Sequence, residues 1–187
     1  MTFSVQTHRF TVEDFHRMET AGILKEDDRV ELIDGELIEM TPIGPAHSAC
    51  VNRLTRILVQ RAGDRVLVSV QNAVVMRPRS EFYPDVAVLR PRADDYAAEL
   101  PGPQDVLLLI EVADTALRFD REVKLPRYAE VGIPEVWIVN LSDASIEVYR
   151  DPAPTGYRST TAFRRGDQLK PSLLPALNIA VSEILPP

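Results

Sequence analysis

The fold is decided by two apolar runs, Tyr83-Pro84-Asp85-Val86-Ala87-Val88-Leu89 and Val106-Leu107-Leu108-Leu109-Ile110-Glu111. Both runs are rich in Val, Leu and Ile and have the length of a buried strand. If they pair antiparallel, the start of the first run lies beside the end of the second. This pairing brings the carboxylates of Asp85 and Glu111 together at one edge of a sheet.

The surroundings predicted for Glu111 are apolar, because side chains alternate along a strand and Leu107, Leu109 and Ala113 would share its face. A carboxylate in such a setting is costly unless its charge is compensated. A divalent cation, which prefers oxygen ligands, or an ammonium group such as that of Lys124 would compensate it. The structural alternative is that Asp85 only starts a strand and Glu111 reaches solvent at a strand end.

The N-terminal part shows a short helix, a hairpin and a longer helix. Residues 11–18 predict a helix with a Thr11/Asp14 capping box, and residues 29–40 predict a hairpin turning at Asp34-Gly35. Apolar residues at helical spacing predict a helix from Ala46 to Ala62 that Gly63 ends. Residues 65–76 are expected to form a strand region interrupted at 71–72, and residues 77–82 a loop.

The part after the second run predicts a crossover. Asp120 is expected to cap a helix that carries Lys124 and ends at Gly132, and residues 135–140 form the next buried strand. A helix between two strands makes them parallel neighbours. Residues 145–150 then return as a strand, 157–163 form an edge strand, and 173–185 cover the core. The fold class is therefore α/β with a mixed central sheet flanked by helices.

Composition indicates one soluble domain of ordinary type. The chain has 187 residues, 45% hydrophobic and 26% charged, and one cysteine, Cys50. One cysteine excludes an internal disulfide and a cysteine-based zinc site, and the chain has neither a membrane-spanning run nor a signal-peptide pattern. We therefore expect a cytoplasmic protein without membrane contact. The net charge of -7 argues against a tight, sequence-blind DNA coat protein, but not against an enzyme that binds nucleic acid transiently.

The ordered motifs resemble the Uma2 family of endonucleases, which belongs to the restriction-endonuclease-like PD-(D/E)XK superfamily. The resemblance covers about residues 10–150 and rests on 30–37 (Val-Glu-Leu-Ile-Asp-Gly-Glu-Leu), 83–88 (Tyr-Pro-Asp-Val-Ala-Val), 110–115 (Ile-Glu-Val-Ala-Asp-Thr), 120–124 (Asp-Arg-Glu-Val-Lys) and 128–139 (Tyr-Ala-Glu-Val-Gly-Ile-Pro-Glu-Val-Trp-Ile-Val). It implies a restriction-endonuclease-like domain spanning 1–187, with an N-terminal helix and β-hairpin, a core over about 10–150, and C-terminal strands and a covering segment over 151–187.

The resemblance also implies the residues of a catalytic site. Asp85, Glu111 and the backbone carbonyl of Val112 would hold Mg²⁺ or Mn²⁺, and Lys124 would position water or stabilise charge on the phosphate. The wider superfamily places this lysine two residues after the second acid, where this chain has Ala113, whereas the Uma2 family supplies it from the following helix. The departure from the superfamily pattern therefore agrees with the Uma2 family.

Glu31 is a further catalytic candidate, and His47 and Gln71 are weaker candidates for substrate binding. Glu31 would complete an acidic rim, although a solvent-facing strand residue is the alternative. His47, in the first turn of a helix, is a candidate for contact with a substrate phosphate or a structural histidine. Gln71 is a possible donor and acceptor near the site, or simply a polar residue in a strand.

The function that these residues imply is metal-dependent cleavage of phosphodiester bonds in nucleic acid, with DNA as the expected substrate and a homodimer as a possible assembly. Two alternatives stay open. One is a catalytically silent, nuclease-like binding or assembly module, which Lys124 pointing away from Asp85 and Glu111 would favour. The other is a metal-dependent hydrolase of another substrate, with which the net negative charge of the chain is consistent.

Overall fold

The computed structural model describes residues 7–25 and 27–185. Its elements in chain order are α1 (Val12–Thr20), β1 (Val30–Ile33), β2 (Glu36–Glu39), α2 (Pro45–Ala62), η1 (Gly63–Arg65), β3 (Leu67–Ser69), β4 (Val74–Met76), β5 (Ser80–Phe82), β6 (Val86–Leu89), η2 (Pro103–Asp105), β7 (Val106–Ala113), α3 (Leu117–Phe119), η3 (Asp120–Lys124), α4 (Leu125–Glu130), β8 (Glu135–Asn140), β9 (Ser145–Ala153), β10 (Gly156–Phe163), β11 (Gln168–Leu169), β12 (Ile179–Ala180) and α5 (Val181–Ile184).

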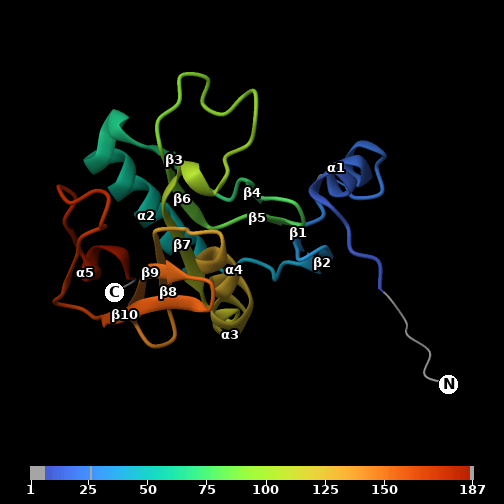
Figure 1. Cartoon of the computed structure of the whole chain (residues 1–187). Helices are drawn as coiled ribbons and strands as arrows, with labels where there is room; N and C mark the ends of the chain where they lie inside the picture. The colour runs from blue at the N-terminus through green and yellow to red at the C-terminus, as the bar shows by residue number, and fades with distance from the viewer. Residues whose placement is uncertain (1–6, 26, 186–187) are drawn as a thin grey trace.

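The strands within these described residues form two main sheets. The central sheet has the order β10-β9-β8-β7-β6-β3, the N-terminal sheet has the order β2-β1-β5-β4, and β11 pairs with β12. Figure 1 shows the N-terminal sheet and α1 to one side of the central sheet. Strands β6 and β7 pair antiparallel with Val86 opposite Ile110, and β7 and β8 run parallel. The predicted pairing of the two apolar runs and the mixed α/β sheet are confirmed.

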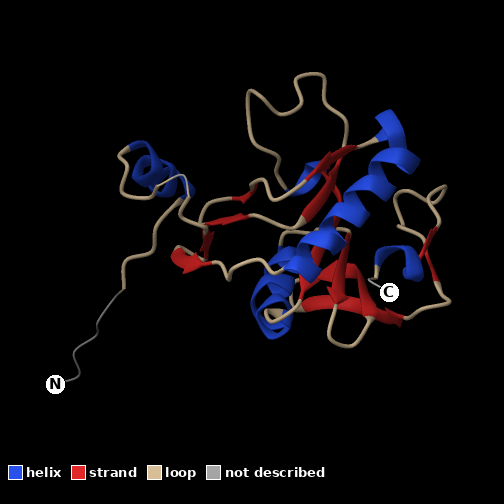
Figure 2. Cartoon of the chain, turned by 180° about the vertical axis from the view of Figure 1, so that it is seen from behind, coloured by secondary structure: helices blue, strands red, loops and turns tan. Residues whose placement is uncertain are grey.

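Helices cover both faces of the central sheet, as the alternation of its side chains requires. One face packs Val86, Ile110 and Trp137 against α2 and the C-terminal segment. The opposite face packs Leu109 and neighbouring strand residues against Leu125 and Tyr128 of α4. Figure 2 shows α2 lying across the sheet. The C-terminal segment covers the core and β10 is an edge strand, as predicted.

A β-bulge changes the facing of one predicted residue. The register of β6 and β7 shifts between Val88 and Leu89, where Leu89 pairs with Val106 and Val88 with Leu108. The extra residue of β7 is Leu107, which packs in the core on the α2 face. The expectation that Leu107 shares the Glu111 face is therefore wrong, because a bulge interrupts the two-residue alternation.

The N-terminal elements form as their local sequences predict. Thr11 and Asp14 make the capping box of α1, and residues 34–35 turn the β1–β2 hairpin with φ of 50° at Asp34 and 80° at Gly35. Helix α2 ends at Gly63, whose φ is 54°. These features are local, and the sequence therefore contains the signals for them.

Two strand predictions need correction. Residues 77–82 are not all loop, because Ser80–Phe82 forms β5, which pairs with β4 and β1 and is buried. Residues 65–76 divide into β3 and β4, which belong to different sheets. The chain leaves the central sheet between them, at Gln71, whose φ is 53°.

The helical segment that carries Lys124 begins earlier than predicted. It starts at Leu117 with Ala116 at its N-cap, so Asp120 does not cap it and lies inside it. Residues 120–124 form a π turn, in which the Leu125 N–H donates to the Asp120 carbonyl. Gly132, with φ of 82°, ends the segment as predicted.

The described residues include no helix that is both long and apolar enough to cross a membrane.

Candidate active site

Asp85 and Glu111 lie side by side at one end of the β6–β7 pair. Asp85 immediately precedes β6, and Glu111 follows Ile110, the partner of Val86. The backbone N–H of Asp85 points to Glu111 Oε2 at 3.4 Å. The side chain of Asp85 is 13% exposed and that of Glu111 is 4% exposed, so the alternative in which Glu111 reaches solvent is wrong.

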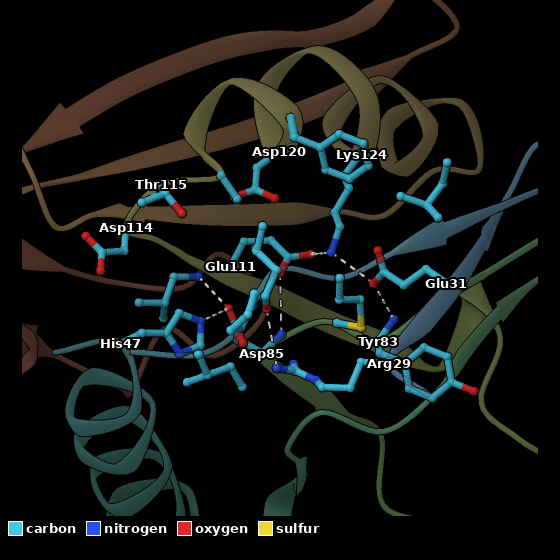
Figure 3. A pocket seen from close by; sticks show the side chains of 18 of the residues that line it. Arg29, Glu31, His47, Tyr83, Asp85, Glu111, Asp114, Thr115, Asp120 and Lys124 are labelled. Carbon is cyan, nitrogen blue, oxygen red and sulfur yellow. Dashed lines mark hydrogen bonds and ion pairs between the residues drawn. The ribbon is translucent and has the colours of Figure 1, made fainter. Parts of the chain in front are cut away.

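Lys124 points into this acidic pair and not away from it. Its Nζ lies 2.9 Å from Glu31 Oε1 and 3.4 Å from Glu111 Oε1 (Figure 3). Tyr128, one turn further along the helical segment, donates its hydroxyl to Glu111 Oε1 at 2.6 Å. Residues four apart in a helix share a face, and both side chains therefore reach the same carboxylate.

Glu31 belongs to the same cluster, although it is on the N-terminal sheet. It is 1% exposed and accepts a hydrogen bond from the Tyr83 N–H at 2.9 Å, in addition to its contact with Lys124. Its alternative as a solvent-facing strand residue is wrong. The N-terminal sheet thus supplies a carboxylate to the end of the central sheet.

His47 and Gln71, the weaker candidates, both contact Asp85. His47 Nε2 lies 2.9 Å from Asp85 Oδ2, and Gln71 Nε2 donates to Asp85 Oδ1 at 3.1 Å. The Val112 N–H donates to Asp85 Oδ2 at 2.9 Å. These contacts hold the Asp85 carboxylate in place from three directions. Within the part of the chain that the structure describes, His47 Nδ1 is buried without a partner.

The electrostatics of the site differ from one carboxylate to the next. Burial raises the pKa of Glu111 in spite of the nearby Lys124 ammonium. Burial also opposes the charge of Asp85, but hydrogen bonds from His47 and Val112 outweigh it and lower the pKa of Asp85. Burial likewise disfavours the Lys124 ammonium, but Glu111 and Glu31 outweigh it and raise the pKa of Lys124. Lys124 therefore stays charged, and acts as a donor.

Asp120 is a site residue that the sequence analysis did not identify. It is 5% exposed and lines the same cavity as Asp85 and Glu111. The helix-cap interpretation concealed it, although its spacing of four from Lys124 was a signal that both side chains share a face. In Figure 3 its carboxylate lies on the helical side of the cavity.

The residues present fit a divalent cation. The cavity has a volume of about 430 Å³, and its lining includes the carboxylates Glu31, Asp85, Glu111 and Asp120 but only one buried ammonium among the described residues, that of Lys124. This excess of negative charge favours a hard cation with oxygen ligands. No set of three His, Cys, Asp or Glu side chains among residues 7–25 and 27–185 is arranged to hold a metal by itself. Backbone, solvent or substrate oxygens would therefore complete the coordination.

The backbone of Val112 is oriented so that its carbonyl oxygen faces the side of β7 where Asp85 lies. A strand residue directs its N–H and C=O to the same side, and neighbouring residues direct theirs to opposite sides. The Val112 N–H donates to Asp85, whereas the Ala113 carbonyl accepts a bond from Leu141 on the β8 side. The Val112 carbonyl accordingly faces the Asp85 side of β7.

A mixed central sheet flanked by helices, with an N-terminal helix, is the fold of a restriction-endonuclease-like α/β protein. The Uma2 family, described as "Putative restriction endonuclease", matches residues 12–182, and the chain belongs to this family. Among solved structures, a protein from Anabaena variabilis ATCC 29413, described as "a putative nuclease belonging to DUF820", has a TM-score of 0.71 and 16% sequence identity, and the match covers 94% of this chain and 97% of that one. At this identity the likeness supports the fold alone. No curated protein matches the chain.

Proposed function

We propose that this protein is a metal-dependent endonuclease that hydrolyses phosphodiester bonds in nucleic acid, with DNA as its substrate. The observation that carries the proposal is the contact of Lys124 with Glu111, next to Asp85, in a cavity with surplus negative charge. Membership of the Uma2 family supports the same activity.

The acidic residues would bind the cation, and the lysine would act on the phosphate. Asp85, Glu111 and the Val112 carbonyl would hold Mg²⁺ or Mn²⁺, which when bound polarises a phosphate and lowers the pKa of water. Lys124 has three N–H donors, of which Glu31 and Glu111 accept two. The remaining donor has no partner among residues 7–25 and 27–185, and it would bind a phosphate oxygen and stabilise the charge that develops during attack.

Other side chains keep these groups in position. Tyr128 and Lys124 fix the Glu111 carboxylate, whereas His47 and Gln71 fix Asp85. A preorganised carboxylate needs no rearrangement when the substrate binds. We propose this positioning role for His47 and Gln71 in place of direct substrate contact.

The binding-module alternative rested on a lysine that points away from the acids. Lys124 lies 3.4 Å from Glu111 and 2.9 Å from Glu31, so the condition that would favour that alternative is not met. A hydrolase of another phosphodiester differs only in its substrate, and the assay below distinguishes it.

The test is cleavage of single- and double-stranded DNA and RNA with Mg²⁺ or Mn²⁺, with and without EDTA. We expect cleavage of DNA by the wild type and losses of at least about 100-fold for Asp85→Asn, Glu111→Gln and Lys124→Met, since each removes charge from the reacting centre. Glu39→Gln, which changes an exposed carboxylate of the same cavity, is the matched control.

Two results would refute the proposal. One is a folded wild type that cleaves none of these nucleic acids with either metal. The other is a set of site variants that cleave at the wild-type rate. Thermal melts of every variant show whether a lost activity reflects the site or a lost fold.

A further inference from the structure

Hydrolysis of a phosphodiester by water requires a proton acceptor near the attacking oxygen. Lys124 does not serve, because the acids around it raise its pKa and it remains a donor. The acceptor must be a base that lines the cavity. The carboxylates there are the first candidates, and this inference rests on the proposed nuclease function.

Three of these carboxylates are already occupied by protein donors. Glu31 accepts from Lys124 and from the Tyr83 N–H. Glu111 accepts from Tyr128 and Lys124.

Asp85 is held in the same way. It accepts from Gln71 and the Val112 N–H, and pairs with His47. Donors of this kind occupy the lone pairs of a carboxylate and fix its orientation. Asp85, Glu111 and Glu31 are therefore suited to binding and not to taking up a proton.

Asp120 differs from them in one respect. Only 5% of the Asp120 surface is exposed, yet its carboxylate has no hydrogen bond or ion pair with any described residue. It lines the cavity with Asp85 and Lys124, and Figure 3 shows it on the same side as Lys124. The Asp120 oxygens are not among the enclosed polar atoms that lack a partner, so they are open to the cavity, where a water or a substrate can reach them.

The local backbone explains this placement. Asp120 and Lys124 begin and end the π turn, and single π turns inside helices occur often at functional sites. The turn widens the helix where both side chains are directed at the cavity. An ordinary helix cap, as the sequence suggested, would instead have supplied Asp120 with backbone donors.

We propose that Asp120 is the general base of this site, accepting the proton of the water that attacks the scissile phosphate. The water oxygen forms a bond to phosphorus, its proton passes to the Asp120 carboxylate, and the bond from phosphorus to the leaving oxygen breaks. The leaving oxygen takes a proton from solvent, and Asp120 returns its proton to solvent. Lys124, four residues away, stabilises the negative phosphate while Asp120 accepts the proton.

The chemistry of Asp120 suits this role. Burial raises its pKa above the ordinary value in spite of the Lys124 ammonium, which makes it a better base than a solvated aspartate. The charged and titratable groups that face it are Lys124, Asp85, Glu31, His47 and Glu111.

The experiment compares wild type, Asp120→Asn, Asp120→Glu and Asp114→Asn in the cleavage assay. We expect Asp120→Asn to lower kcat about 10²- to 10⁴-fold with KM within about twofold, because a general base acts on the chemical step. Asp120→Glu should recover part of the loss. Asp114 is an exposed carboxylate lining the same cavity, and Asp114→Asn should cleave within about twofold of the wild type.

Two further measurements separate a base from a structural residue. The rise of kcat with pH should disappear from the residual activity of Asp120→Asn. Its thermal midpoint should equal or exceed that of the wild type, because the substitution removes an unpaired buried charge.

Each outcome decides the inference. Wild-type cleavage by Asp120→Asn overturns the inference and leaves the nuclease function intact. A lowered thermal midpoint with an unchanged pH profile also overturns it, since Asp120 would then be structural. A wild type that cleaves nothing refutes the proposed function itself, and the base with it.

Discussion

Two buried glutamates of the central sheet, Glu111 and Glu135, differ in the direction of their pKa shifts. Burial raises the pKa of Glu111, and the Lys124 ammonium does not offset it. Burial acts in the same direction on Glu135, but hydrogen bonds from Arg150 and Ser172 outweigh it and lower its pKa. Glu135 therefore stabilises the fold as an ion, whereas the ionised form of Glu111 is held at a cost in stability.

Glu135→Gln should destabilise the protein by about 2–4 kcal/mol at neutral pH. The Glu135 carboxylate is fully buried and accepts from Trp137 at 2.6 Å, Arg150 at 2.9 Å and the Ser172 N–H at 2.7 Å. These are all donors, so the amide NH₂ of a glutamine would oppose one of them. Urea denaturation of both proteins at pH 7 measures the difference.

The same variant should show a pH dependence of known sign. Because the folded pKa of Glu135 lies below its ordinary value of 4.5, its contribution to stability is present above that pH and is lost as the pH falls through the lowered pKa. The difference in the free energy of unfolding between wild type and Glu135→Gln should become smaller toward pH 3. Glu183→Gln, at a half-exposed ion pair with Arg61, should cost less than about 1 kcal/mol. A gap that persists undiminished at pH 3 would contradict the assignment.

At the scale of elements, the sequence predicted what depends on local pattern. The hairpin at Asp34-Gly35, helix α2 and the pairing of β6 with β7 each follow from periodicity or turn residues. The short polar strand β5 was missed because its buried Glu81 is stabilised from a distance, by His16 at 2.7 Å. A sequence pattern does not contain such a partner.

The candidate site likewise combines features that the sequence predicted with one that it did not. The proximity of Asp85 and Glu111 followed from strand pairing, and the position of Lys124 on the helical segment after β7 was part of the family resemblance. The place of Asp120 depended on a π turn, which local composition does not specify. A cap interpretation was the natural reading of an aspartate before a helical segment.

Two glycines with positive φ provide a prediction about elements. Gly132→Ala, at the end of α4, should cost about 1 kcal/mol, because φ is 82° but no atom of the described residues, its chain neighbours apart, lies within 4 Å of the added Cβ. Gly35→Ala, in the β1–β2 turn, should cost at least about 2 kcal/mol, because its Cβ would also meet the Phe10 carbonyl at 2.8 Å. Urea denaturation ranks the two variants. Equal costs would show that the contact with Phe10 yields without strain.

At the scale of the whole molecule, the site depends on two sheets meeting. Lys124 and Glu31 are 93 residues apart in the chain. Lys124 belongs to the helical segment that packs on the central sheet, and Glu31 belongs to the N-terminal sheet. Their contact joins the two sheets at the site itself, where the Tyr83 N–H also donates to Glu31 and Asp85 lies beside Glu111. The positive charge at this junction is small. Arg29 and Lys124 are the lysine and arginine residues that line the cavity in the described part of the chain, and the chain carries a net charge of -7.

This charge distribution predicts a shallow salt dependence of nucleic-acid binding. Each phosphate neutralised by Lys or Arg contributes about -0.9 to the slope of log affinity against log salt. With Arg29 and Lys124 as the contacts, the slope is about -1.8, and raising KCl from about 50 to 200 mM should weaken binding about tenfold. Fluorescence anisotropy of a labelled DNA duplex, at constant divalent cation, measures this slope. Arg29→Gln should reduce it by about one unit, and a thousandfold loss in the wild type would instead require an extended basic surface that engages several more phosphates.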